Sequence, residues 1–173
     1  MLTIDLKQMI RSVPDFPKPG INFFDITTLL KDPNGLQATI DSIAAPYSSA
    51  GIHTVVGIES RGFILGSAVA QRIGAGFVPM RKPGKLPAKT LKEIYDLEYG
   101  KDALEIHADA IEKGQRVLIV DDVLATGGTA AAATRLVRQL GGELKGLAFL
   151  IELTFLDGKA KLPGENVFSV LKY

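Results

Sequence analysis

The chain has 173 residues, of which 46% are hydrophobic and 23% charged, a composition that excludes a disordered or fibrous protein. Its net charge of +1 creates no overall field toward nucleic acid or an anionic membrane, so we expect neither as a partner. The absence of cysteine excludes disulfides and thiolate metal sites, and no apolar run approaches the roughly 20 residues of a membrane span. Because the N-terminus lacks the basic-then-apolar order of a secretion signal, we expect a cytoplasmic protein.

The first fifty residues predict an extended segment followed by a helix. Residues 14–27 contain three prolines within their first six positions, which indicates an ordered extended loop or a lid. Residues 33–49 predict a helix, because Pro33 suits a first turn. Pro46 must end or kink this helix.

From residue 54 onward, short apolar runs alternate with segments of helical periodicity. The strands are predicted at 54–59, 76–80, 116–122 and 144–153, and the helices between them at 61–74 and 129–142, with Gly141 as a left-handed cap. Residues 81–93 are basic, are interrupted by proline and glycine, and predict a mobile surface loop. This alternation predicts an α/β fold, with a mostly parallel sheet flanked by helices.

The strand at 116–122 ends in two acids and leads into a turn of small and hydroxyl residues. Ligands of open α/β sheets bind beyond the carboxyl ends of the strands, where Asp121 and Asp122 lie. The turn that follows can surround a phosphate with free amides at a helix N-terminus, and consists of Ala125, Thr126, Gly127, Gly128 and Thr129. A plain strand-to-helix turn with aspartate caps is the alternative.

The two acids need a partner other than the phosphate, which they would repel. Ribose hydroxyls or a hydrated Mg²⁺ ion suit carboxylates at this position. The sequence therefore predicts a sugar phosphate, with its phosphate in the turn and its hydroxyls beside Asp121 and Asp122.

This stretch resembles the signature of the type I phosphoribosyltransferases, which bind 5-phosphoribosyl 1-pyrophosphate. Four segments are similar to the adenine-specific members of that family, namely 17–30, 55–66, 77–87 and 95–111. The resemblance implies the type I fold over residues 1–173 as a single domain, in which residues 1–35 contribute a base-binding hood. It also implies a flexible loop and a homodimer. The chain departs from the PGxxFRD motif at Phe24, where the motif has arginine.

The resemblance also implies the reaction and the residues that carry it. The 5-phosphoribosyl group would move to N9 of adenine, giving AMP and pyrophosphate in purine salvage, with Mg²⁺ bound mainly through the substrate and Asp121 and Asp122 as candidate ligands. Pyrophosphate would be bound by Glu59, Ser60, Arg61, Arg81, Lys82 and Lys85, with a cis peptide between Glu59 and Ser60. Adenine would contact Ile21, Asn22, Phe23 and Phe24. Glu98 would act as a proton acceptor or as a stabiliser of the ribosyl cation.

Each assignment has a plainer alternative. Arg61 could be a surface charge at a helix start, the basic loop a solvated loop, Glu98 an exposed carboxylate, and Ile21 and Phe23 core residues. Two other functions also compete: a sensor of phosphoribosyl pyrophosphate that regulates transcription, and an enzyme acting on a 6-oxo purine. The sensor is disfavoured, because residues 1–53 show no basic stripe or recognition helix. A carbonyl that accepts from the adenine amino group would reject the 6-oxo purines.

Overall fold

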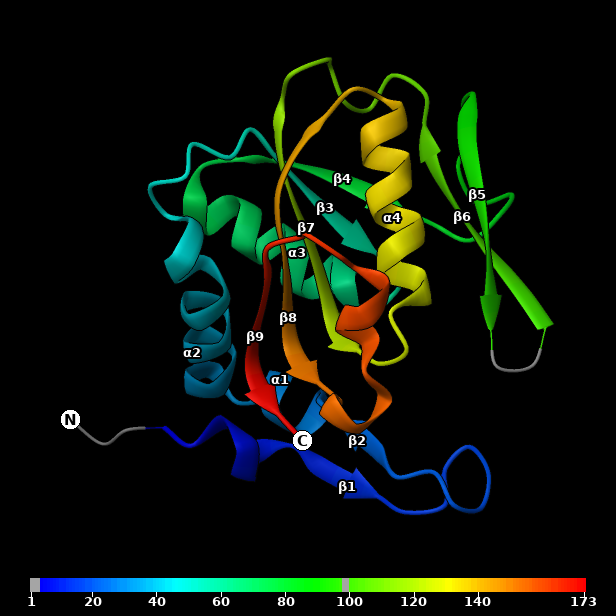
Figure 1. Cartoon of the computed structure of the whole chain (residues 1–173). Helices are drawn as coiled ribbons and strands as arrows, with labels where there is room; N and C mark the ends of the chain where they lie inside the picture. The colour runs from blue at the N-terminus through cyan, green and yellow to red at the C-terminus, as the bar shows by residue number, and fades with distance from the viewer. Residues whose placement is uncertain (1–3, 98–99) are drawn as a thin grey trace. The chain divides into compact units, whose positions relative to one another are not determined.

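The computed structural model describes residues 4–97 and 100–173 and divides into two compact units, residues 1–42 and 43–173 (Figure 1). The first unit is small and is built on an antiparallel strand pair. Its elements are the 3-10 helix η1 (Leu6–Met9), the strands β1 (Arg11–Val13) and β2 (Phe23–Asp25), and the helices α1 (Thr27–Leu30) and α2 (Pro33–Ala44), the last of which runs into the second unit.

The extended loop predicted at 14–27 is shorter in the structure. Its prolines confine the irregular backbone to the first part, whereas Phe23–Asp25 pair with β1 and Thr27 begins α1. Aromatic residues favour strands, so Phe23 and Phe24 take up the ladder once the prolines are past. The expected effect of Pro46 is confirmed, because α2 ends at Ala44 and a 3-10 turn, η2 (Ala45–Tyr47), follows.

The second unit contains a five-stranded parallel sheet in the order β4-β3-β7-β8-β9 (Figure 1). Its strands are β3 (Thr54–Ile58), β4 (Gly76–Met80), β7 (Arg116–Leu124), β8 (Glu143–Glu152) and β9 (Val167–Lys172), and the helices α3 (Arg61–Ile73) and α4 (Gly128–Gln139) connect the strands. The parallel α/β fold predicted from the sequence is therefore confirmed. The strand β9 was not predicted.

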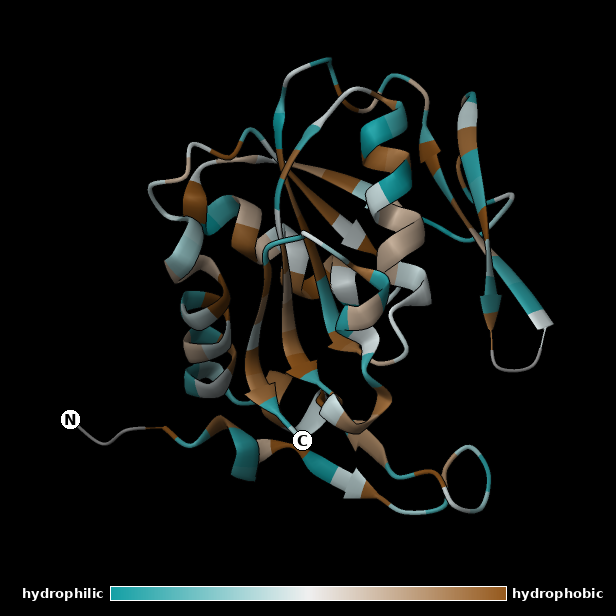
Figure 2. Cartoon of the chain, in the orientation of Figure 1, coloured by the Kyte–Doolittle hydropathy of each residue, from teal (hydrophilic) through white to brown (hydrophobic). Residues whose placement is uncertain are grey.

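The two helices cover opposite faces of this sheet. A Cβ atom added to Gly57 of β3 would lie 2.6 Å from the Gly62 carbonyl oxygen, so this position faces α3 at very short range. Val56 and Ile58 alternate with Gly57 and belong to the buried cluster that includes Leu136 of α4. Because the central strands have helices on both sides, they are apolar along most of their length, as the brown ribbons of Figure 2 show.

The C-terminus of α4 has the expected glycine cap. Gly141 adopts φ +84°, its amide donates to the Arg138 carbonyl, and the Gly142 amide donates to the Val137 carbonyl. This pair of hydrogen bonds is the Schellman arrangement, so the left-handed cap predicted at Gly141 is confirmed.

A separate antiparallel hairpin replaces part of the predicted basic loop. Its strands are β5 (Thr90–Leu97) and β6 (Gly100–His107), so the loop after β4 spans 81–89 and not 81–93. Lys92 and Glu93 obscured the strand in the sequence, because they place a charge on each of its two faces and so interrupt the alternation of apolar and polar residues. Two 3-10 turns, η3 (Thr154–Leu156) and η4 (Gly158–Lys161), follow β8. None of the helices in the described ranges is long and apolar enough to cross a membrane.

Candidate active site

The carboxyl ends of three neighbouring strands bring most of the predicted site residues together. Ile58 of β3 pairs with Met80 of β4, and Gly57 pairs with Val120 of β7. Because parallel strands end at the same edge, the segments that follow them converge there. The residues so placed are Glu59, Ser60 and Arg61 after β3, Arg81, Lys82 and Lys85 after β4, and Asp121 and Asp122 near the end of β7.

The loop between β7 and α4 forms a small cavity at this edge. The cavity has a volume of about 80 Å³, room for a group the size of a few water molecules at about 30 Å³ each. Its lining includes Asp121, Ala125, Thr126, Gly127 and Thr129. Gly127 precedes α4 with φ +80°, a left-handed conformation that disfavours any side chain.

The first turn of α4 has backbone amides that are free to donate to a ligand beside this loop. The Ala131 amide donates to the Gly127 carbonyl at 2.9 Å, which starts the helical hydrogen-bond ladder. The amides of Gly128, Thr129 and Ala130 come before that bond and have no acceptor within the helix. Such a helix N-terminus binds an anionic oxygen group well.

The two acids occupy different environments. Asp122 is buried and forms an ion pair with Arg61, whose Nε donates to its Oδ2. Burial, together with the neighbouring charge of Asp122, raises the pKa of Asp121 well above its usual value. A ligand that donates hydrogen bonds or carries positive charge would therefore stabilise the ionised form of Asp121.

A second ion pair links the strand ends of β3 and β4. Arg81 lies 3.4 Å from Glu59, and the Lys82 amide donates to Glu59 at 2.9 Å. The hydrogen bond from this amide, aided by Arg81 and Lys85, lowers the pKa of Glu59. The peptide bond between Glu59 and Ser60 is cis, as the resemblance implied.

Lys82 is held by two residues that the sequence analysis missed. Its ammonium donates to Asp102 and, at 3.1 Å, to the Tyr95 hydroxyl. Although partial burial opposes the charged form, these hydrogen bonds raise the pKa of Lys82. Tyr95 and Asp102 face each other across the β5–β6 hairpin, so recognising that hairpin would have revealed the pair. Glu98, the predicted catalytic residue, lies outside the described residues.

The residues predicted to bind adenine belong to the first unit. Phe23 and Phe24 are half-buried on β2, and the Phe23 ring packs edge-on against Phe16 at 5.3 Å between centroids. Ile21 is 38% exposed, and Asn22 accepts a hydrogen bond from Ser12 at 2.7 Å. Phe23 and Ile21 thus present apolar surface, but their assignment to adenine stays a prediction.

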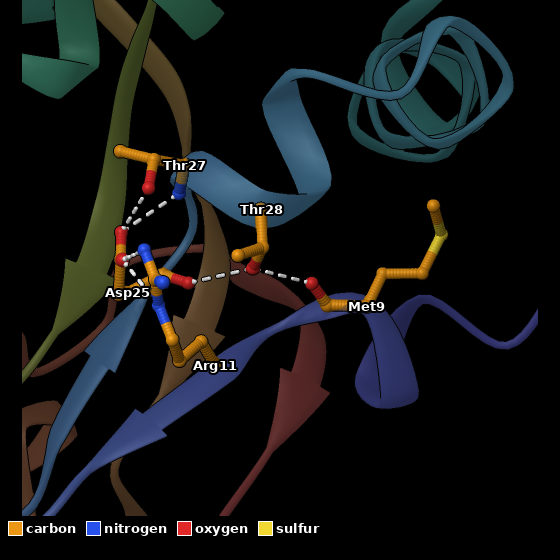
Figure 3. Close-up of polar contacts among 5 residues, drawn as sticks. All are labelled: Met9, Arg11, Asp25, Thr27 and Thr28. Carbon is orange, nitrogen blue, oxygen red and sulfur yellow. Dashed lines mark hydrogen bonds and ion pairs between the residues drawn. The ribbon is translucent and has the colours of Figure 1, made fainter.

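Asp25, the residue after Phe24, organises the surrounding segment (Figure 3). Its carboxylate accepts from Arg11 at 2.6 Å, from the Thr27 hydroxyl at 2.6 Å and from the Thr27 amide at 2.9 Å. The Thr28 hydroxyl donates to the Met9 carbonyl at 2.7 Å, which ties α1 to η1. The segment is therefore anchored by Arg11 from the paired strand, without an arginine at position 24.

The titration of Asp25 should reveal this anchor. The Thr27 hydrogen bonds and Arg11 lower the pKa of Asp25 to about 2, so its stabilising contribution is present above about pH 4 and is lost as the pH falls toward 2. We expect Asp25→Asn to lower the melting temperature at neutral pH and to flatten the pH dependence below pH 4. Carboxyl NMR of the wild type measures the pKa directly, and a midpoint near 4 would contradict the anchor.

Comparisons with known proteins decide the family. The family model described as "Phosphoribosyl transferase domain" matches residues 25–166. The chain belongs to the phosphoribosyltransferase family. An adenine phosphoribosyltransferase of Acidobacterium capsulatum is 61% identical over 168 residues, covering 97% of this chain and 93% of the relative.

Solved structures of phosphoribosyltransferases agree with this assignment. The adenine phosphoribosyltransferase of Rhodothermus marinus has a TM-score of 0.93 at 58% identity, covering 97% of this chain and 96% of its own. That of Saccharomyces cerevisiae, solved with adenine and an iminoaltritol bisphosphate, has a TM-score of 0.91 at 44% identity and covers 96% of each chain. The likeness therefore extends over nearly the whole phosphoribosyltransferase chain, including the segments that carry the predicted site.

Proposed function

We infer that this phosphoribosyltransferase transfers the 5-phosphoribosyl group from 5-phosphoribosyl 1-pyrophosphate to N9 of adenine, releasing pyrophosphate and AMP in purine salvage. The observation that carries this inference is the cavity of loop 125–129, with its glycine-rich backbone, next to the acid pair Asp121 and Asp122. The near-full-length similarity to adenine phosphoribosyltransferases supports adenine as the base.

Each part of the sugar substrate has a matching group. The amides of loop 125–129 and the hydroxyls of Thr126 and Thr129 hold the 5-phosphate, while Asp121 and Asp122 accept from the ribose hydroxyls. The pyrophosphate is held by the cations at the ends of β3 and β4, which are Arg61, Arg81, Lys82 and Lys85. The hood residues Ile21, Asn22, Phe23 and Phe24 would bind adenine.

Magnesium fits the donor set at this edge. Carboxylate oxygens are its preferred protein ligands, and the raised pKa of Asp121 marks a position where added positive charge is favourable. No group of three or more candidate ligands occurs among residues 4–97 and 100–173, so Asp121 and Asp122 would share Mg²⁺ with substrate oxygens. When bound, the ion would neutralise charge on the departing pyrophosphate.

The chain's own groups position and stabilise the displacement. The N9 lone pair forms the new bond to the anomeric carbon while the bond to the pyrophosphate oxygen breaks, and its electron pair leaves with pyrophosphate. Glu98 would accept the N9 proton, or would stabilise the ribosyl cation while the departing pyrophosphate accepts that proton. Catalysis then depends on holding both reactants in line and on excluding water from the cation. A homodimer, which the family resemblance implies, and the cytoplasmic location expected from the sequence complete this proposal.

Base-dependent pyrophosphate release tests the function. The purified chain is incubated with Mg²⁺, 5-phosphoribosyl 1-pyrophosphate and one of adenine, guanine, hypoxanthine or xanthine. We expect release with adenine at least about 100-fold faster than with the 6-oxo bases, which present an acceptor where adenine presents a donor. Turnover with a 6-oxo base alone would overturn the choice of base. Tight sugar-phosphate binding without turnover of any base would instead favour the regulatory sensor.

A further inference from the structure

Glu152 is a buried acid beside the phosphate loop that the reaction described above does not use. It ends β8 and pairs in register with Leu124, the last residue of β7, after which the loop begins. The Leu153 amide donates to the Leu124 carbonyl at 2.9 Å, which extends this pairing past the strand end. Glu152 is only 7% exposed, so its carboxylate requires a partner within the protein.

That partner is Lys159, which belongs to the turn η4. The Lys159 ammonium lies 3.0 Å from Oε2 of Glu152, and the two side chains are 39% and 9% exposed. Although burial opposes ionisation, the ion pair with Lys159 and the charge of Lys172 lower the pKa of Glu152. The pair therefore ties η4 to the end of β8.

The residue before Lys159 rests directly on the phosphate loop. A Cβ atom added to Gly158 would lie 2.3 Å from the Ala125 carbonyl oxygen and 3.1 Å from the Gly127 nitrogen. In return, a Cβ atom added to Gly127 would lie 2.2 Å from the Gly158 carbonyl oxygen. The two backbones are thus in contact through glycines on both sides, and Figure 1 shows the orange turns after β8 beside the loop between β7 and α4.

We propose that Glu152 and Lys159 are positioning residues for the 5-phosphate subsite, which they set by holding Gly158 against loop 125–129. The proposal rests on the function inferred above, in which this loop binds the phosphate. Several amides must converge on one phosphate, and such convergence is lost when the backbone shifts by a fraction of an ångström. The ion pair fixes η4, whose backbone packs against the loop that carries those amides.

Ligand affinities separate this role from a merely structural one. We expect Glu152→Gln and Lys159→Met each to weaken ribose 5-phosphate binding about 10-fold or more, because the loop relaxes away from its binding geometry. Pyrophosphate binds at the ends of β3 and β4, so its affinity should change less than about 2-fold. Lys159→Arg retains the ion pair and should retain most of the affinity for ribose 5-phosphate. Isothermal titration calorimetry with each ligand gives these values.

Glu165→Gln provides a matched control. Glu165 is similarly buried, with 8% of its side chain exposed, and pairs at 2.6 Å with Arg138 near the other end of α4. This variant should lose thermal stability while keeping its affinity for ribose 5-phosphate. Equal losses of affinity in Glu152→Gln and Glu165→Gln would overturn the proposal, and so would an unchanged affinity in Lys159→Met. Because Lys159 is the more exposed partner, Lys159→Met also tests the ion pair if Glu152→Gln does not fold.

A loop variant distinguishes failure of this proposal from failure of the proposed function. If Gly127→Ala weakens ribose 5-phosphate binding and the ion-pair variants do not, the positioning role alone is overturned. If Gly127→Ala also leaves that affinity unchanged, loop 125–129 is not the phosphate subsite and both proposals are overturned.

Discussion

Gly127→Ala is expected to lower kcat/KM for 5-phosphoribosyl 1-pyrophosphate at least about 100-fold, a loss typical of displaced oxyanion donors. The added methyl would lie 2.2 Å from the Gly158 carbonyl oxygen, so the loop or η4 must move. In addition, alanine is strained at the φ of +80° that this position requires. Both effects move the amides away from the 5-phosphate. Steady-state kinetics with varied sugar substrate, and calorimetry with AMP, measure the loss.

Gly164→Ala separates the effect of backbone strain from that of the steric clash with the Gly158 carbonyl oxygen. Gly164 has φ +76° and open space around its Cα, so alanine there is strained without a clash. We expect a loss of roughly 1–2 kcal/mol in the free energy of unfolding and an unchanged kcat/KM. If Gly164→Ala lowers kcat/KM as much as Gly127→Ala does, the contact with Gly158 is not what shapes the site.

Glu98→Ala should lower kcat by about 10²- to 10⁴-fold, the contribution of a positioned proton acceptor. The prediction rests on the family resemblance, because Glu98 lies outside the described residues. Loss of the carboxylate leaves the N9 proton or the ribosyl cation without its partner, whereas pyrophosphate is held by other residues. We therefore expect the dissociation constant of pyrophosphate to stay within about 2-fold. Rapid-quench measurement of AMP formation isolates the chemical step.

Asp96→Ala is the control for loss of a carboxylate close to Glu98 in the sequence. Asp96 is exposed on β5 and, like Glu98, carries a carboxylate, so its removal changes the net charge of the chain by the same amount. It should leave kcat close to the wild-type value. A Glu98→Ala variant with full turnover would remove Glu98 from the mechanism, and equal losses in both variants would indicate a general charge effect.

The parts of the fold buried on both faces could be predicted from the sequence. Residues 54–58 and 116–120 are short apolar runs between helical segments, and this pattern alone specifies central parallel strands. The strand β9 could not be recognised in the same way. Its residues are mostly half-buried and include Ser169 and Lys172, so they show neither a continuous apolar run nor a clear alternation.

The parts of the site that are continuous in the sequence could be predicted, whereas contacts between residues distant in the sequence could not. Loop 125–129 is a continuous motif whose glycines and position after a strand could be interpreted without the structure. Asp102, the partner of Lys82, lies on β6, 20 residues later in the sequence, and the pairing of Glu152 with Lys159 depends on how η4 folds back on β8. Such contacts depend on three-dimensional packing, which one sequence does not specify. The single domain and its hood remain a prediction.

Arg61, Arg81 and Lys82 are each already paired with a carboxylate at this edge of the sheet. Chloride could satisfy one cation only by leaving an acid unpaired, which is unfavourable in a partly buried place. In the proposed function, a pyrophosphate group would compete for all three cations at once, and Mg²⁺ held by Asp121 and Asp122 would offset part of the charge of the displaced acids. The protein's own carboxylates would therefore compete with simple anions for these cations.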